Sequence, residues 1–217
     1  MNWKLPNLLT VGRLALSVVF FALLANSHVV PRPDTGTLTA CLAIYIVAGF
    51  TDVLDGYLAR RWRLTSAFGR IADPFVDKVM VCGAFALLAG GNFAFPVGGP
   101  AGDVERRLPY WLHGGMASAV QSWMVVVLIG REFVISGIRG YSESQGQKFA
   151  ATWAGKLKMF VQSLAICTIL IQLAFMPNTA WAIVSKIVLV WLTVLVTLAS
   201  GLAYVNRARG LLAGDEA

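Results

Sequence analysis

Apolar stretches of about 20 residues recur along this whole chain, and they restrict its fold more than any other feature. A helix needs about 20 apolar residues to cross the hydrocarbon core of a bilayer, because each residue adds about 1.5 Å. Hydrophobic residues make up 57% of the 217-residue sequence and charged residues 13%. A typical soluble domain has about 25% charged residues. The sequence therefore predicts an all-α membrane protein.

Six apolar stretches each predict one transmembrane helix. They cover approximately residues 8–24, 38–58, 71–88, 119–138, 157–175 and 180–204. The segments between them contain Gly, Pro or charged residues and predict connections, at 26–37, 90–113, 140–154 and 176–178. With no internal repeat and no linker in the pattern, we expect one membrane domain over residues 1–217.

The net charge of +7 is distributed as in a membrane protein and not as in a nucleic-acid-binding protein. Most basic residues lie at the ends of apolar stretches, where Lys and Arg mark the cytoplasmic side. Six helices bring both termini to one side, and the basic residues on that side are Arg60, Arg61, Arg63, Arg70, Arg139, Lys148, Arg207 and Arg209. We expect an integral protein of a bacterial inner membrane, with both termini in the cytoplasm.

Four aspartates lie in the second and third apolar stretches. Asp52 and Asp55 are three residues apart, and Asp73 and Asp77 are four apart, so each pair shares a helix face. Neighbouring antiparallel helices would bring the two pairs together. Carboxylates at membrane depth need compensation, and an oxygen-only ligand set suits hard divalent cations.

Two other interpretations of the aspartates remain open. They could form ion pairs with Arg60, Arg70 and Lys78, or they could line an ion or proton pathway. A pathway would spread its carboxylates through the membrane, whereas these four cluster near one helix end.

The aspartates belong to a longer pattern. It contains Asp52, Asp55, Gly56, Ala59 and Arg60, then eight intervening residues, then Gly69, Asp73 and Asp77. This pattern resembles the complete signature of the CDP-alcohol phosphotransferase family. The six-helix outline also resembles that family over essentially the whole chain.

The resemblance implies a reaction and a set of roles. The family transfers a substituted phosphate from a CDP-linked substrate to an alcohol and releases CMP. Asp52, Asp55, Asp73 and Asp77 match ligands of two divalent cations, Mg²⁺ or Mn²⁺, and Asp77 also matches the general base. Positions that match the CDP-binding site are Asp52, Gly56, Ala59, Arg60 and Gly69. The resemblance further implies a homodimer and an active-site cavity that opens to lipid and cytoplasm at the cytoplasmic side.

Shorter segments are similar to one subgroup, the phosphatidylglycerophosphate synthases. These segments are Leu5–Thr10 with Arg13, Gly130–Phe133, Ser136–Arg139, and Gly155–Lys158 with Gln162. They imply CDP-diacylglycerol and glycerol 3-phosphate as substrates. A small phosphorylated acceptor needs cations, and the expected phosphate pocket contains Arg131, Arg139, Lys156 and Lys158. Inositol phosphate, serine and phosphatidylglycerol remain alternative acceptors.

Overall fold

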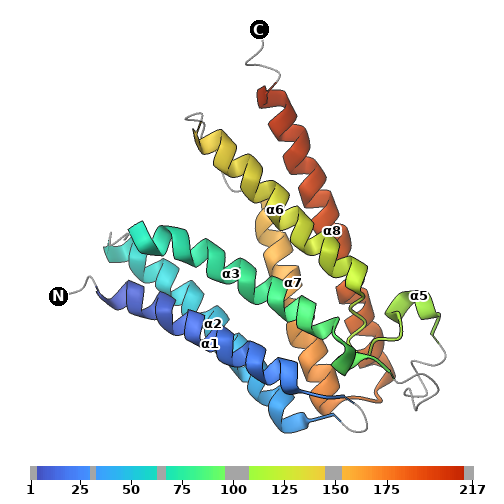
Figure 1. The fold of residues 1–217 in the computed structure, drawn as a ribbon. Helices are drawn as coiled ribbons and strands as arrows, with labels where there is room; N and C mark the ends of the chain where they lie inside the picture. The colour runs from blue at the N-terminus through green and yellow to red at the C-terminus, as the bar shows by residue number, and fades with distance from the viewer. Residues whose placement is uncertain (1–3, 30–32, 63–66, 96–107, 145–152, 213–217) are drawn as a thin grey trace.

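The computed structural model of this chain describes residues 4–29, 33–62, 67–95, 108–144 and 153–212, with only the backbone described near several helix ends. These residues form an all-α fold (Figure 1). The α-helices are α1 (Lys4–Asn26), α2 (Thr35–Trp62), α3 (Ala67–Leu88), α5 (Tyr110–His113), α6 (Ser122–Ser144), α7 (Trp153–Phe175) and α8 (Ala180–Leu212). A short 3₁₀ turn, η1 (Gly91–Phe93), follows α3.

Each of the six predicted apolar stretches is a long helix, but the helix ends differ from the prediction. Residues 140–144, expected in a polar connection, continue α6 to Ser144. The predicted start at Ala119 is also wrong, because Ala119 has a φ of 60° and α6 begins at Ser122. Hydropathy identifies where a helix is apolar, whereas helix ends depend on backbone conformation and hydrogen bonding.

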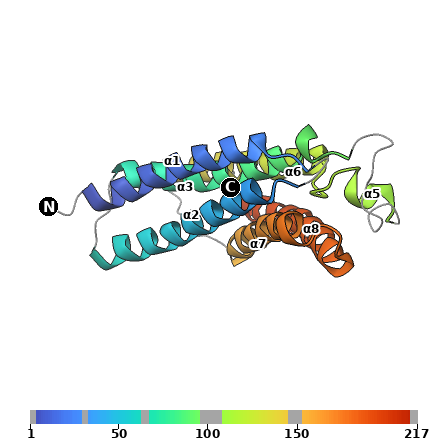
Figure 2. The same cartoon turned by 90° about the horizontal axis from the view of Figure 1, so that it is seen from below.

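The helices form two groups that diverge from a common end (Figures 1 and 2). In one group, α1 packs against both α2 and α3; in the other, α8 packs against both α6 and α7. The groups meet through contacts of α2 with α7 and of α3 with α6 and α7. Successive long helices alternate in direction, so the two chain termini lie at the diverging ends (Figure 1).

The main apolar core lies where the two groups meet. It includes Phe20 of α1, Tyr45 of α2, Phe85 of α3, Leu128 of α6 and Ile166 of α7. All six long helices contribute to it, and Val190 and Val194 come from α8. The core therefore fixes how the aspartate-bearing helices stand relative to α6, α7 and α8.

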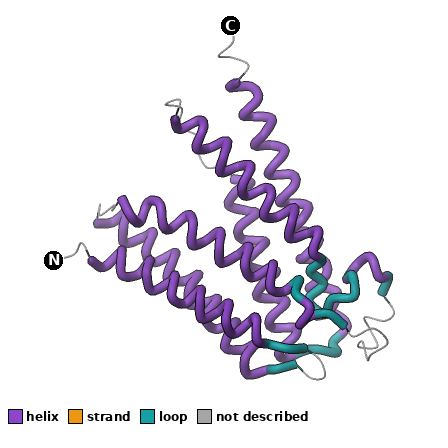
Figure 3. The backbone as a smooth tube through the Cα atoms, viewed as in Figure 1, coloured by secondary structure: helices purple, strands orange, loops and turns teal. Residues whose placement is uncertain are grey.

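Loops gather at the common end, opposite the termini (Figure 3). Residues Ala94 and Met116 form an isolated antiparallel bridge there. The buried Lys186 of α8 donates to the backbone oxygen of Ala117 and to Oε1 of Gln172 on α7. These hydrogen bonds tie the segment before α6 to the ends of α7 and α8.

Within the described residues, three helices contain stretches long and apolar enough to cross a membrane. The stretches are Thr35–Asp52, Gly155–Phe175 and Ala180–Asn206, and α1 contains a shorter apolar stretch, Thr10–Asn26. The helices α3 and α6 have 22 and 23 residues, but both carry several charged residues. The expected all-α class is thus confirmed, and the expected number of six spans stays a prediction.

Candidate active site

Two of the four predicted aspartates, from two different helices, contact one arginine. Nη1 of Arg13 on α1 forms ion pairs with Oδ1 of Asp52 on α2 and, at 3.3 Å, with Oδ1 of Asp77 on α3. The Arg13 side chain is 2% exposed, whereas Asp52 is 38% and Asp77 25% exposed. The structure therefore brings both carboxylates to a single positive charge.

The buried face of α1 explains why Arg13 points toward these aspartates. Thr10, Arg13, Ser17, Phe20 and Leu24 recur at intervals of three or four residues, and all are buried. Along this face the side chains change from polar to apolar. The apolar part enters the core, and the polar part lies between α2 and α3 at the level of Asp52 and Asp77.

The other signature residues lie on α2 and α3, but their side chains fall outside the described part of the structure. They are Asp55, Gly56, Ala59, Arg60, Gly69 and Asp73. Both helices have continuous backbones through these positions, so the spacing of each aspartate pair still places it on one helix face. Among the described side chains, no three potential His, Cys, Asp or Glu ligands come together, and this search did not include Asp55 or Asp73.

Of the three cations considered as alternative ion-pair partners of the aspartates, Lys78 has a described side chain. Its Nζ donates to Oγ of Ser136 on α6, at 2.5 Å. Arg60 and Arg70 lie among the residues whose side chains are not described. The described cation beside the aspartates is Arg13, whose sequence position belongs to the subgroup resemblance.

A second charged cluster joins α6, α7 and α8. Oε1 of Glu132 accepts from Nη1 of Arg131, at 2.9 Å, and from Nζ of Lys158. Arg131 also donates from Nη2 to Oγ of Ser200, at 3.2 Å. The three charged side chains are buried or mostly buried and together carry one net positive charge.

The four basic residues predicted for the acceptor pocket are therefore not equivalent. Arg131 and Lys158 share one carboxylate, while Nε of Arg139 donates to the hydroxyl of Tyr204 on α8, at 3.5 Å. Lys156 is exposed. Arg139 lies eight positions after Arg131, which corresponds to a rise of about 12 Å along α6.

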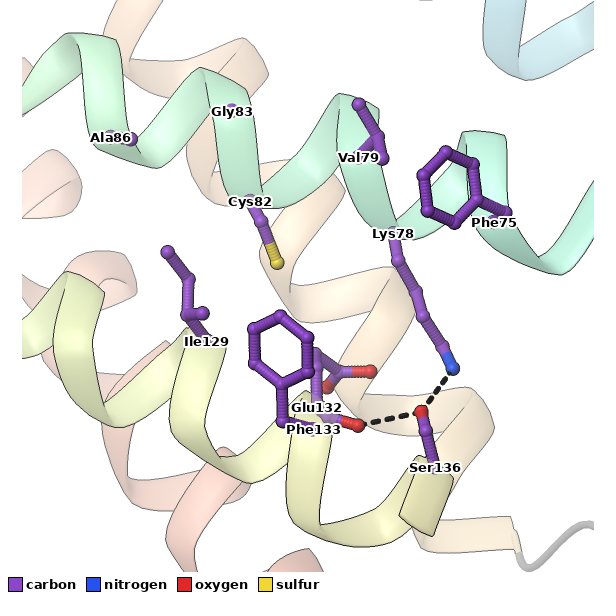
Figure 4. A pocket seen from close by; sticks show the side chains of 10 residues that line it. All are labelled: Phe75, Lys78, Val79, Cys82, Gly83, Ala86, Ile129, Glu132, Phe133 and Ser136. Atoms are coloured by element: carbon purple, nitrogen blue, oxygen red, sulfur yellow. Dashed lines mark hydrogen bonds between the residues drawn. The ribbon is translucent and has the colours of Figure 1, made fainter. Parts of the chain in front are cut away.

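A cavity of about 620 Å³ lies between α3 and α6 (Figure 4). Its wall is mostly apolar, and its polar lining residues are Lys78, Glu132 and Ser136. Lys78 follows Asp77 in the sequence, and Glu132 belongs to the second charged cluster. The cavity wall thus contains one residue adjacent to the aspartate site and one member of the second charged cluster.

The sequence as a whole matches known proteins over nearly its full length. A family model described as CDP-alcohol phosphatidyltransferase covers residues 3–199. The chain belongs to this family. The CDP-alcohol phosphotransferase resemblance drawn from the aspartate pattern is thereby confirmed, and proteins of the family are generally dependent on divalent cations.

Individual members of the CDP-alcohol phosphatidyltransferase family agree with the subgroup resemblance. A protein of Haemophilus influenzae is 30% identical over 98% of this chain and 97% of its own length. One of Escherichia coli K12 is 31% identical over 96% of this chain and 97% of its own. One of Bacillus subtilis is 28% identical over 94% of this chain and 95% of its own length. Each is named CDP-diacylglycerol–glycerol-3-phosphate 3-phosphatidyltransferase.

Family membership and the apolar helices together identify an integral membrane protein. Glu132 lies within the Gly130–Phe133 segment of the subgroup resemblance, and the structure shows that it contacts both its neighbour Arg131 and Lys158 of α7. The sequence signal for Arg13 is its spacing: it lies three residues after Thr10 and four residues before Ser17, which places all three on one helix face.

Proposed function

We propose that this membrane enzyme transfers the phosphatidyl group of CDP-diacylglycerol to glycerol 3-phosphate, giving phosphatidylglycerophosphate and CMP. The observation that carries the proposal is the contact of Asp52 and Asp77 with the single guanidinium of Arg13. The relatives that match nearly the full length of the chain are named for this reaction. Two carboxylates from separate helices that already accommodate a cation suit a metal site.

In the proposed reaction, the acceptor hydroxyl attacks the phosphorus that carries diacylglycerol. A new P–O bond forms there, the P–O bond to CMP breaks, and CMP keeps that bridging oxygen. The hydroxyl proton passes to a carboxylate oxygen of Asp77, because a hydroxyl is a weak nucleophile at neutral pH. Two divalent cations, Mg²⁺ or Mn²⁺, held by Asp52, Asp55, Asp73 and Asp77 would neutralise the diphosphate and the departing CMP.

The remaining signature residues would bind the nucleotide. In this proposal Asp52, Gly56, Ala59, Arg60 and Gly69 hold the CDP group, with glycine and alanine leaving room beside the helix backbone. Arg60 adds a charge-assisted hydrogen bond to phosphate.

The basic cluster would bind the phosphate of the acceptor. Arg131, Arg139, Lys156 and Lys158 are the proposed contacts, and Glu132 keeps Arg131 and Lys158 aligned. Nε of Arg131 is buried and has no hydrogen-bond partner among the described residues, so it could donate to an acceptor oxygen.

The membrane setting of the proposal follows the distribution of basic residues. Both termini and the active site would face the cytoplasm of a bacterial inner membrane, six helices would cross it, and two copies of the single domain would form a homodimer. An even number of crossings would bring both termini to one side, and both lie at the diverging ends of the helices (Figure 1).

The test is CMP release by the purified protein in detergent, with CDP-diacylglycerol, Mg²⁺ or Mn²⁺, and one acceptor at a time. We expect release that depends on glycerol 3-phosphate. Release only with inositol phosphate, serine or phosphatidylglycerol would replace the proposed acceptor. No release with any acceptor, from folded protein, would reject the proposed reaction.

A further inference from the structure

The aspartate site contains a cation that belongs to the protein. Arg13 Nη1 lies against Oδ1 of both Asp52 and Asp77, and its side chain is almost completely buried. Neighbouring residues on the other faces of α1, including Val11 and Leu14, are exposed and apolar. The guanidinium is thus directed inward, away from a surface suited to lipid.

Burial of this arginine needs the aspartates. A buried guanidinium is unfavourable unless carboxylates and hydrogen bonds compensate for its lost hydration. Two carboxylates from α2 and α3 provide that compensation here, and in return the arginine reduces their mutual repulsion. A divalent cation at the proposed site would be held by carboxylate oxygens of the same two aspartates.

We propose that Arg13 and the divalent cation compete for Asp52 and Asp77, so that Arg13 acts as the counter-ion of the metal-free site. The inference rests on the proposed metal site at the aspartates. Two cations a few ångströms apart repel strongly where water is scarce. Binding of the metal therefore displaces the guanidinium from the carboxylates. The displaced guanidinium can then face the diphosphate of the lipid substrate.

Competition predicts an effect opposite to that of a purely structural ion pair. If Arg13 only aligned the aspartates, its removal would weaken metal binding. If Arg13 competes, Arg13→Gln binds Mn²⁺ more tightly, by roughly fivefold or more, which is the usual lower range of coupling between two sites. The metal-free variant should also melt at a lower temperature than the metal-free wild type, and Mn²⁺ should raise its melting temperature more.

The experiment is a Mn²⁺ titration of the detergent-purified protein, with free Mn²⁺ followed by electron paramagnetic resonance. Melting temperatures in EDTA and in saturating Mn²⁺ complete it. Lys186→Gln is the control, because it also removes one positive charge, at a lysine outside the proposed active site that contacts Ala117 and Gln172 at the common end of the helices. Its Mn²⁺ affinity should equal that of the wild type.

Arg13→Lys keeps the test informative if Arg13→Gln does not fold. A compact ammonium cannot reproduce the contacts of a planar guanidinium, so this variant should also bind Mn²⁺ more tightly, by a smaller factor. Unchanged or weaker Mn²⁺ binding in the folded Arg13 variants overturns the competition. If that result comes with an active, Mn²⁺-binding wild type, the proposed function stands; a wild type that binds no Mn²⁺ removes the metal site and this inference together.

Discussion

At the scale of single residues, Asp77 is the position where the proposed chemistry can be removed with the smallest change in shape. Asp77→Asn keeps the size of the side chain but replaces the proton-accepting carboxylate with an amide. We expect it to abolish CMP release and to leave the helical circular dichroism unchanged. The melting temperature should fall, because Arg13 loses one of its two carboxylate partners.

The control for Asp77→Asn is Asp34→Asn, because Asp34 is an exposed carboxylate before α2 and far along the chain from the signature. It should retain full turnover. Turnover of Asp77→Asn at a substantial fraction of the wild-type rate would exclude Asp77 as the general base.

Lys186 is a second residue with a specific prediction. Its side chain is 1% exposed, and its ammonium donates to Ala117 O and to Gln172 Oε1. Lys186→Met keeps much of the length of the side chain but leaves these acceptors without their donor. We expect the free energy of unfolding to fall by about 2–3 kcal/mol, measured by denaturant or thermal unfolding in detergent.

The adjacent Ser185 gives the matched control for Lys186→Met. Ser185 is half-buried, and its hydroxyl donates to the backbone oxygen of Trp181 within α8. Ser185→Ala should leave the stability nearly unchanged. Equal stability of Lys186→Met and wild type would mean that the buried hydrogen bonds of Lys186 contribute little.

Residues in the sequence motif could be predicted, but partners across helices could not. The spacing of Asp52 and Asp55 follows from the helical repeat alone. The contact between Arg13 and Asp77 depends on how α1 packs between α2 and α3, and no local pattern specifies that. The same holds for Lys158 with Glu132, which lie 26 positions apart on different helices.

At the scale of helices, Gly83 sets how closely α1 approaches α3. A Cβ atom at Gly83 would lie 2.6 Å from the ring of Phe21 on α1. Gly83→Ala therefore forces the ring or the helices apart, and we expect a loss of about 1–3 kcal/mol in the free energy of unfolding. The melting temperature in detergent measures this loss.

Gly49→Ala on α2 is the control, because a Cβ atom there meets nothing within 4 Å. It should be neutral or stabilise the protein by up to about 1 kcal/mol, since alanine favours helix more than glycine does. Wild-type stability for Gly83→Ala would show that Phe21 moves aside without strain.

The start of α2 carries a prediction about pH. Asp34 accepts hydrogen bonds from the hydroxyl and the backbone N–H of Thr37, the arrangement of a helix N-cap. The Thr37 hydroxyl in particular holds the pKa of Asp34 below its ordinary value of 3.8. The folded state therefore favours the ionised form, and this stabilisation is present above the unfolded pKa and is lost as the pH falls through the lowered one.

Asp34→Asn tests this dependence, because its amide does not titrate. The wild type should exceed the variant in melting temperature at pH 7, and the difference should shrink as the pH is lowered below 4. A difference that does not change with pH would contradict the proposed role of the Asp34 carboxylate.

The six helices were predictable because each has a long apolar stretch, whereas their ends were not. Polar residues 140–144 extend α6 by backbone hydrogen bonding that hydropathy does not detect. In the same way α8 continues past Tyr204 to Leu212. Both α6 and α8 are therefore longer than their apolar stretches, and the extra residues lie at the helix ends where charged residues occur.

At the scale of the whole molecule, the proposed metal site and the proposed acceptor-phosphate pocket belong to different helix groups. The aspartates belong to α2 and α3, and the basic cluster belongs to α6, α7 and α8. Variants in the second group should therefore affect the two substrates unequally. We expect Arg139→Ala or Lys156→Ala to raise the KM for glycerol 3-phosphate by about tenfold, from the loss of one charge-assisted contact, with a smaller effect on the KM for CDP-diacylglycerol.

Steady-state kinetics with each substrate varied in turn measures this difference. Ser144→Ala, at an exposed position near the end of α6, is the control and should change neither constant. Equal increases in both KM values for the Arg139 and Lys156 variants would argue against an acceptor-phosphate pocket in the second group.

The position of Arg13 in the first helix also has a consequence for how the protein is made. During synthesis α1 leaves the ribosome before α2 and α3, so the arginine reaches the membrane before Asp52 and Asp77 do. An internal counter-charge is then present as soon as each acidic helix inserts, before any metal has been acquired. We expect the chain to be able to enter the bilayer and assemble in a metal-poor cell, and to bind the divalent cations of the proposed site afterwards.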